Sequence, residues 1–564
     1  MSSEENLCKE VLGALAGPAP LLMEADLVLR GGRMLTLVPE QPEVEAVAIR
    51  GNRVLAVGTE SELKAYLGPQ TEVIDAQGLT VVPGLTDTHL HLLHYGFALN
   101  QVDLGGVRSV GELRRRVADF VAQRKIKPGR WVLGRGWDQN LLAEGRLPRK
   151  EDLDGIAPEN PMLLSRICGH AALLNRRGLE AAGLTAATPD PEGGRLQRGE
   201  GGELTGIVFE LGAIGLVQRA IPAAGPADLE EALALATARA AQAGLTEAHS
   251  DDLGSAGGFA RAAAAYTALA EGGRLPLRIR MELLVGSLGE LKDVLAAAQD
   301  WQSPSELISL GPIKIVSDGS LGARTAALEE PYSDAPGERG LMNFAAEELK
   351  EMVTLAHQAG FQVAVHVIGD RAARLALEAV EAAQARYPRP DARHRLVHCQ
   401  IMNPALWEKM RALGVAGDVQ PRFVASDWSM VDSRVGKERA RTSYAWKSML
   451  ARGLHLAGGS DCPVEPLDPL LGLHAAIART DPAGNPAGGW QPAEKLAPLT
   501  ALGLFTEGAA YVARAEGERG RLAPGYLADL TAFVGDYLAA PEETALANDV
   551  RLTISAGRVV YRRS

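Results

Sequence analysis

The chain has 564 residues, of which 46% are hydrophobic and 23% are charged, and its formal net charge is −12 at pH 7. This composition is typical of a folded protein with a large core, and it excludes a disordered, collagen-like or coiled-coil chain. The acidic balance makes nucleic acid and anionic membranes poor partners. The four cysteines form no CxxC pair, the first residues carry no positive charge, and no apolar run reaches the ~18 residues of a membrane span. We therefore expect a cytoplasmic protein with reduced thiols.

The two ends of the chain share a β pattern. Residues 1–22 are weakly patterned and are interpreted as an N-terminal extension. From residue 23 to residue 82, short alternating apolar runs are separated by glycine turns, and the same pattern returns in residues 516–564. These segments predict strands that pair into one small sheet domain, with the middle of the chain inserted between them.

The middle of the chain, residues 83–515, alternates strand-like apolar runs with helix-like stretches rich in Ala, Leu and Glu. This alternation predicts a parallel sheet or barrel, and eight candidate strands are the number that a (β/α)8 barrel needs. The gap between the first two strands is too long for one crossover helix, so residues 92–243 should contain an extra subdomain. The candidate strands end near His91, Asp251, Gly286, Asp318, Asp370, Cys399, Gln420 and Asp461.

The first candidate site follows the first strand of the predicted barrel, where an apolar run leads into His89-Leu90-His91. Side chains alternate along a strand, so His89 and His91 point to the same side and can both reach one metal ion. The alternative is a pair of surface histidines without a common role.

A lysine, Lys314, lies inside another apolar strand, where a charged side chain costs free energy unless it is paired or neutralised. It can pair with a carboxylate such as Asp318. It can also be a lysine carboxylated by CO2, whose new oxygens bridge two metal ions.

Three further strands end in residues that bind metals. A single histidine at such a position is more often a satisfied core residue, but His366 and His398 follow successive strands, whose ends share one mouth of a barrel. Asp461 can serve as a metal ligand and general base, or only in an Asx turn or a helix cap. Nitrogen and oxygen ligands without thiolate fit catalytic Zn, Mn, Fe or Co. The full candidate set is His89, His91, Lys314, His366, His398 and Asp461.

These residues stand in phrases that resemble the amidohydrolase superfamily, in particular its amidohydrolase-3 branch of YtcJ-like and N-substituted formamide deformylase-like proteins. The resemblance runs from about residue 24 to the end of the chain, and it implies a metal-dependent (β/α)8 TIM barrel with a small β-sandwich built from both termini (23–82 and 516–564). The matching segments are 83–91, 314–326, 366–372, 459–463 and 520–530. The ligand set implied for one metal ion is His89, His91 and Asp461, and that for a second is His366 and His398, with a carboxylated Lys314 between them.

The implied activity is hydrolysis of an amide-type C–N bond other than a peptide bond, in an N-formyl or N-acyl amine or a cyclic amide. Metal-dependent deaminases carry a glutamate three residues after a strand-end histidine. Here that position holds Gly369 after His366 and Ile401 after His398. The glutamate of the deaminases is therefore missing, which favours hydrolysis of an amide-like bond. The expected nucleophile is a hydroxide that bridges two divalent ions, and Zn is the expected metal. Asp461 is expected to act as general base and acid.

Substrate specificity is expected to come from the 92–243 insertion and from the loop 480–490. Two alternatives to the two-metal hydrolase stay open. One is a non-catalytic small-molecule binding or regulatory protein on the same scaffold, and the other is a hydrolase with one metal ion and an unmodified Lys314. The resemblance also suggests a homodimer. The candidate pocket residues are Trp137, His170, Asp318, Arg324 and Trp490, of which the two tryptophans can equally be packing residues.

Overall fold

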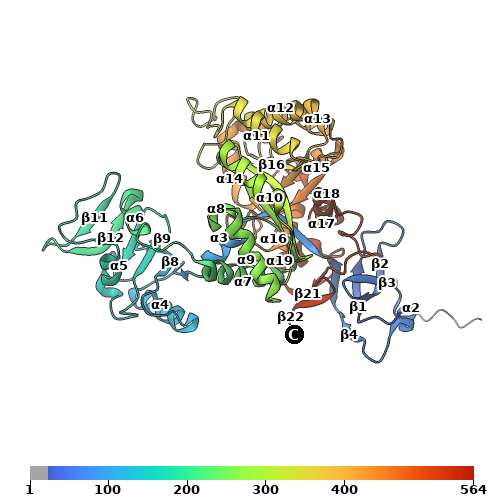
Figure 1. Ribbon diagram of the computed structural model, residues 1–564, viewed down its shortest axis with the longest axis horizontal. Helices are drawn as coiled ribbons and strands as arrows, with labels where there is room; N and C mark the ends of the chain where they lie inside the picture. The colour runs from blue at the N-terminus through green and yellow to red at the C-terminus, as the bar shows by residue number, and fades with distance from the viewer. Residues whose placement is uncertain (1–22, 564) are drawn as a thin grey trace, which may run out of the picture. The chain divides into compact units, whose positions relative to one another are not determined.

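The computed structural model describes residues 23–563. It divides into two compact units: one combines the residues up to Leu92 with those from Thr237 onward, and the other runs from Leu93 to Ala236. In Figure 1 the smaller unit is coloured from blue through blue-green to green. The larger unit includes the β-rich ends of the chain. Over residues 23–563, no helix is both long enough and apolar enough to cross a membrane.

The larger unit contains the predicted barrel. Eight strands pair in parallel in the order β19-β18-β17-β16-β15-β14-β13-β6. The barrel closes beyond these ladders, because Asp461 N donates to His89 O at 2.8 Å and His91 N donates to Cys462 O at 2.8 Å. The fold class is therefore confirmed as α/β with a parallel eight-stranded barrel. The strands are β6 (Leu85–Leu90), β13 (Leu245–Asp251), β14 (Arg278–Leu284), β15 (Ile308–Val316), β16 (Val363–Val367), β17 (Arg395–His398), β18 (Ala416–Val419) and β19 (Leu456–Gly458).

The barrel strands end close to the residues expected from the sequence. The largest differences are at β16, which ends at Val367 before Asp370, and at β19, which ends at Gly458 before Asp461. Amphipathic helices follow the strands and bury their apolar faces, as α12 does through Ala376, Leu377 and Val380. The helices after the barrel strands are α8 (Leu253–Ala256), α9 (Phe259–Glu271), α10 (Leu288–Asp300), α11 (Ala346–Gln358), α12 (Asp370–Arg386), α13 (Pro404–Leu413), α14 (Phe423–Ala440), α15 (Trp446–Ala451), α16 (Pro469–Ala478), α17 (Pro498–Leu504) and α18 (Glu507–Ala513).

Strands from both ends of the described chain join in one mixed eight-stranded sheet, of order β22-β21-β20-β5-β1-β2-β3 with β4 beside β1. The two ends meet at β5, which pairs in parallel with β1 and antiparallel with β20. Leu29, Val47, Leu530 and Ile554 from both halves share one apolar cluster. The strands are β1 (Leu27–Leu35), β2 (Glu43–Arg50), β3 (Arg53–Gly58), β4 (Glu72–Asp75), β5 (Leu79–Pro83), β20 (Leu530–Val534), β21 (Val550–Ser555) and β22 (Arg558–Arg562); the short helices α2 (Glu60–Leu63) and α19 (Pro541–Ala547) accompany them.

The chain passes from this sheet into the barrel at Gly84, between β5 and β6. A side chain does not fit there, since a Cβ on Gly84 would lie 2.2 Å from Thr246 Oγ1 and 2.7 Å from the Asp529 Cβ. The Gly84 N–H donates to Asp529 O at 2.7 Å. Glycine thus allows the close approach that aims β6, and the histidines at its end, into the barrel.

The smaller unit lies in the chain between β6 and β13. Its six-stranded sheet has the order β11-β12-β10-β9-β8-β7. One buried cluster includes Leu113 and Val117 of α4, and a second includes Leu179 of α5 and Val217 of α6. The elements are α3 (Leu92–Leu99), β7 (Val102–Asp103), α4 (Val110–Arg124), β8 (Val132–Trp137), β9 (Met162–Arg166), β10 (Ala171–Leu174), α5 (Arg176–Ala181), β11 (Arg195–Arg198), β12 (Leu204–Phe209) and α6 (Glu210–Gln218), followed by α7 (Pro226–Gln242), which leads to β13.

Candidate metal centre

The six predicted ligands lie at or near the C-terminal ends of barrel strands. Because all strands of this barrel are parallel, these ends meet at one mouth, whatever the distance along the chain. The residues and their strands are His89 and His91 (β6), Lys314 (β15), His366 (β16), His398 (β17) and Asp461 (β19).

The position of Asp461 beside the histidines of β6 is fixed by backbone contacts. The buried Asp87 carboxylate accepts hydrogen bonds from His89 N at 3.1 Å and from Ser460 N at 3.0 Å. A Cβ on Gly459 would lie 2.8 Å from His89 N, so only glycine lets the two segments come this close. Asp461 itself adopts a left-handed conformation with φ of 60°, a strain that structures commonly hold at functional sites.

His89, His91 and Asp461 form the tightest cluster of the mouth. Within residues 23–563 they are the group of three metal-binding side chains whose ligand atoms all lie within 4.8 Å of one another. Asp461 Oδ1 is 3.1 Å from His91 Nε2 and 3.5 Å from His89 Nε2. Burial alone would raise the pKa of Asp461, but its hydrogen bond with His91 and the nearby imidazoles outweigh burial and hold that pKa below its usual range.

Three of the four histidines are held through their Nδ1 atom by an acceptor from another strand or from the residue after it. Each of these acceptors can only accept, so Nδ1 carries a proton and Nε2 is the nitrogen that would bind a metal ion. Metal-binding histidines are held in the same way by carboxylates and carbonyls. The pairs are His89 Nδ1 with Glu282 Oε2 (2.8 Å), His91 Nδ1 with Asp251 O (3.0 Å) and His398 Nδ1 with Gln420 Oε1 (2.8 Å).

The electrostatics of the mouth also suit a cation. Burial lowers the pKa values of His89 and His398 well below their usual range, so both rings are neutral at pH 7. Burial works in the same direction at His91, but the hydrogen bond with Asp461 and the Asp251 carboxylate outweigh it and raise the pKa of His91 to about 9. A proton therefore lies between His91 and Asp461, and metal binding at such a site displaces that proton.

The buried Lys314 donates from Nζ to His89 Nε2 at 2.9 Å, and its nearest carboxylate is Glu282, with Oε2 3.9 Å away. The alternative pairing of Lys314 with Asp318 is not found, since four residues span roughly 13 Å along an extended strand. Asp318 instead accepts backbone hydrogen bonds from Ile368 N at 3.1 Å and Gly369 N at 2.9 Å.

His366 and His398 lie next to each other, with ring centroids 4.5 Å apart, and the His398 ring is 5.6 Å from that of His89. His366 Nε2 is 3.3 Å from Asp318 Oδ1. His398 adopts a left-handed backbone with φ of 79°, a conformation that is strained for a residue with a side chain. The four imidazoles thus follow one another across the mouth in the order His91, His89, His398 and His366.

Three charged side chains inside the barrel strands were missed by the sequence analysis. Glu282 on β14 bonds to His89, and its Oε1 is 3.3 Å from Nη2 of Arg395 on β17. Arg395 Nη1 donates to Asp418 Oδ2 on β18 at 2.9 Å, and all three side chains are fully buried. The signal was available, since each is a charged residue within an apolar parallel strand, where charges are rare unless paired.

Two predicted pocket residues lie in the smaller unit. Trp137 is fully buried in the core of that unit, and its Nε1 donates to Leu164 O at 2.7 Å. This is the packing role that the sequence left as its alternative. His170 is exposed, and its Nδ1 is 2.8 Å from Glu210 Oε2, so its ring remains accessible to solvent.

The other predicted pocket residues lie in the larger unit. Arg324 is partly buried and forms an ion pair with Asp334 at 2.9 Å. Trp490 is buried, with its ring centroid 5.6 Å from that of Tyr444 and 5.3 Å from the guanidinium carbon of Arg479. Trp490 therefore also packs inside the unit. Asp318 touches a predicted ligand, His366, as described above.

Comparison with known proteins agrees with this geometry. The chain is 35% identical to the putative amidohydrolase YtcJ of Bacillus subtilis, over 95% of this chain and 99% of that protein. It is 28% identical to the N-substituted formamide deformylase of Arthrobacter pascens, over 90% of this chain and 92% of that protein. The crystal structure of an uncharacterised metal-dependent hydrolase from Pyrococcus furiosus superposes with a TM-score of 0.73 at 31% identity, over 91% of this chain and 99% of that one. Residues 72–561 match the model of the Amidohydrolase family, and the chain therefore belongs to this family.

Proposed function

We propose that the protein is a metal-dependent hydrolase that cleaves an amide-type C–N bond of a small molecule, such as an N-formyl or N-acyl amine or a cyclic amide. The observation that carries the proposal is the convergence of four imidazoles and the Asp461 carboxylate at one barrel mouth, with three imidazoles held through Nδ1 so that Nε2 is the nitrogen that would bind a metal ion. The relative described as an N-substituted formamide deformylase supports the substrate class.

The residues of the mouth fit divalent ions. His89, His91 and Asp461 would hold one ion, and His366 and His398 a second, with a carboxylated Lys314 between them. Neutral imidazoles and one carboxylate without thiolate are the donors of catalytic zinc sites, and they also accept Mn, Fe or Co. Bound ions would polarise a carbonyl group and lower the pKa of water toward neutrality.

Asp461 performs the proton transfers in this proposal. Its lowered pKa keeps the carboxylate ionised at neutral pH, so Oδ1 can accept a proton from the attacking water. The same carboxyl group then donates this proton to the amide nitrogen as the C–N bond breaks, which releases an amine and a carboxylic acid. Asp461 is only 8% exposed, and this burial limits proton exchange with bulk water between the two steps.

A one-metal hydrolase is the second candidate, and one observation favours it. Within residues 23–563, only His89, His91 and Asp461 satisfy the close spacing of a ligand group. The amine form of Lys314 also has a hydrogen-bond acceptor in His89 Nε2. In this version Lys314 remains unmodified and orients His89.

Elemental analysis of protein purified without chelator tests the proposal, together with a hydrolysis screen of N-formyl amines, N-acyl amines and cyclic amides. About two divalent ions per chain would support the carboxylated lysine between two ions, and about one would favour the second candidate. No bound metal and no hydrolysis, even after reconstitution with metal and bicarbonate, would overturn both and favour a binding protein.

A further inference from the structure

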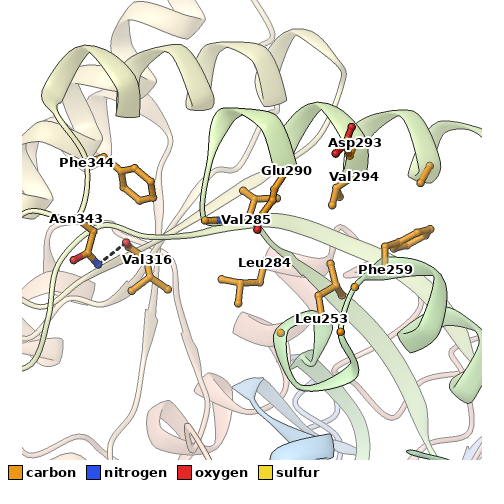
Figure 2. Close-up of a pocket in the computed structure, with 15 residues that line it drawn as sticks. Leu253, Phe259, Leu284, Val285, Glu290, Asp293, Val294, Val316, Asn343 and Phe344 are labelled. Carbon is orange, nitrogen blue, oxygen red and sulfur yellow. Dashed lines mark hydrogen bonds between the residues drawn. The ribbon is translucent and has the colours of Figure 1, made fainter. Parts of the chain in front are cut away.

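A cavity of about 830 Å³ opens beside the C-terminal ends of β13, β14 and β15. Figure 2 shows its side chains, which come from the ends of β14 and β15, from α8 and α9 after β13, from α10 and from residues 343–344. Its volume lies in the range of small-molecule sites, about 300–1,000 Å³. The apolar part of the lining consists of Leu253, Phe259, Leu284, Val294, Val316 and Phe344.

The strand register places this cavity directly next to the candidate metal centre. Leu284 follows Glu282 by two residues on β14, and Val316 follows Lys314 by two residues on β15. Side chains two residues apart point to the same face of a strand, so the cavity floor is the next layer toward the mouth. The neighbouring strand β16 supports the same placement, because Val316 of the cavity floor stands in register with the predicted ligand His366.

The charge of the lining is one-sided. Glu290 and Asp293 of α10 line the cavity, and none of its lining residues is basic. Glu290 Oε2 accepts from Gly286 N at 2.7 Å, which holds this carboxylate at the strand end. An anionic group entering the cavity would meet these carboxylates without a cation to pair with, whereas an uncharged apolar group would bury its surface against the hydrophobic side chains.

We propose that this cavity binds the uncharged apolar substituent, aryl or medium-length alkyl, of the amide substrate and so determines its specificity. The inference rests on the proposed function, because it places the scissile bond at the metal centre. The substituent belongs either to the acyl half or to the amine half of the amide. An apolar substituent would make the same contacts with the cavity from either half of the amide. The two substrate series below distinguish the acyl half from the amine half.

Two adjacent alanines of α10 provide a matched pair of variants. Ala297 lines the cavity and Ala296 does not, and both are exposed. Ala297→Phe would fill part of the cavity, whereas Ala296→Phe adds the same side chain outside it. Neither residue belongs to the candidate metal centre, and exposed helix positions tolerate this change with little loss of stability.

The kinetic test uses two substrate series with the metal-loaded enzyme: N-methyl amides with formyl to octanoyl groups, and N-alkylformamides with methyl to octyl groups. In the series that fills the cavity, kcat/KM should rise about fourfold per added methylene. Ala297→Phe should lower kcat/KM by at least about tenfold for the longest member and leave the shortest within about twofold, with Ala296→Phe like wild type. A terminal carboxylate should abolish the gain with length. Absence of a length dependence in both series, or equal effects of the two variants, would overturn the inference.

A binding measurement separates this inference from the proposed function. Methyl ketones from 2-butanone to 2-decanone have a carbonyl group but no C–N bond, and their Kd values can be measured by calorimetry. The longest ketone should bind at least about tenfold more weakly to Ala297→Phe than to wild type or Ala296→Phe. If no amide is hydrolysed but the ketones behave in this way, the proposed function fails and the cavity remains a ligand site. If amides are hydrolysed while neither amides nor ketones respond to length or to Ala297→Phe, the cavity inference fails alone.

Discussion

Two groups of buried histidines lie in the barrel unit, and their hydrogen bonds differ. His394 directly precedes β17, and its ring bonds to His357 of α11. In this pair every ring nitrogen has a protein partner: Val363 N donates to His394 Nδ1 at 2.9 Å, His394 Nε2 donates to His357 Nδ1 at 2.8 Å, and His357 Nε2 donates to Tyr387 O at 2.7 Å. This chain of single donors and acceptors satisfies both rings as neutral imidazoles.

Two histidines at the C-terminal mouth meet charged side chains at Nε2 instead. The Nε2 atoms of His91 and His89 lie 3.1 and 3.5 Å from Asp461 Oδ1, and His89 Nε2 also accepts a hydrogen bond from Lys314 Nζ. His357 and His394 are as buried as His89 and His398, so burial does not separate a ligand from a packing residue. The partner of Nε2 does separate them, since it is a histidine or a backbone carbonyl in the His357–His394 pair and a charged side chain at the mouth. Variants in both groups can test the comparison.

The largest effect is expected for Asp461→Asn. The amide keeps the size of the side chain but cannot take up the proton, so kcat should fall by about 10²–10⁴-fold. The fold should remain, which circular dichroism and the midpoint of thermal unfolding would verify. The measurement is kcat of the variant at wild-type metal content, because loss of metal would mimic loss of the base. Full activity in a metal-loaded variant would refute the role of Asp461 as the base.

Lys314→Ala tests whether the lysine belongs to the metal centre. If a carboxylated lysine lies between two ions, the variant should lose metal, and added short carboxylates such as acetate or propionate should restore part of it. Elemental analysis after dialysis is the readout. Unchanged metal content would contradict the bridge and favour the one-metal candidate.

The sequence predicted the barrel and the candidate ligands because the relevant signals are local. A parallel strand that ends in a histidine or an aspartate is visible within about ten residues, as at His89 and His366. The partners of these ligands are not local. Glu282, Arg395 and Asp418 lie on three different strands and contact each other only once the strands have assembled into the barrel.

The same reason explains why the alternative pairing of Lys314 is not found. Asp318 is the carboxylate nearest to Lys314 in the sequence. In an extended strand, however, two residues four positions apart are separated by roughly 13 Å along the strand axis. The carboxylate that approaches Lys314 comes from the adjacent strand, where Glu282 stands two residues before the in-register partner Leu284. Trp137 and Trp490 show a further limit, since their burial depends on contacts that no local pattern encodes.

Glu282→Gln should have a smaller effect than either ligand variant. The amide can still accept from His89 Nδ1, but it no longer stabilises positive charge on the ring, so metal affinity should fall by about 10–100-fold. A titration with a competing chelator measures this affinity. The matched control is Glu247→Gln on the neighbouring strand β13, where a buried glutamate contacts His249 at 3.2 Å and Arg519 at 2.7 Å. Equal loss of metal affinity in both variants would contradict a positioning role that is specific to Glu282.

The smallest effect on the metal centre is expected for a variant of the His357–His394 pair. His394→Gln removes the bond to His357, so the free energy of unfolding at pH 7 should fall by about 1–3 kcal/mol, while metal content and kcat stay at wild-type values. Urea unfolding with parallel metal analysis checks both. Loss of metal in this variant would break the distinction between the His357–His394 pair and the histidines of the candidate metal centre.

The pH dependence of this variant sharpens the same test. Burial lowers the pKa of His394 to about 3, whereas in the unfolded chain it returns to about 6.5. Between these values the unfolded wild type binds a proton that the folded wild type does not, so His394 stabilises the protein fully above pH 6.5 and less as the pH falls. The stability difference between wild type and His394→Gln should therefore be largest at neutral pH and shrink by up to about 1.4 kcal/mol per pH unit below about 6.5. A difference that stays constant between pH 7 and pH 5 would show that His394 takes up its proton in the folded protein, and the closed chain of hydrogen bonds around it would then not describe a neutral pair.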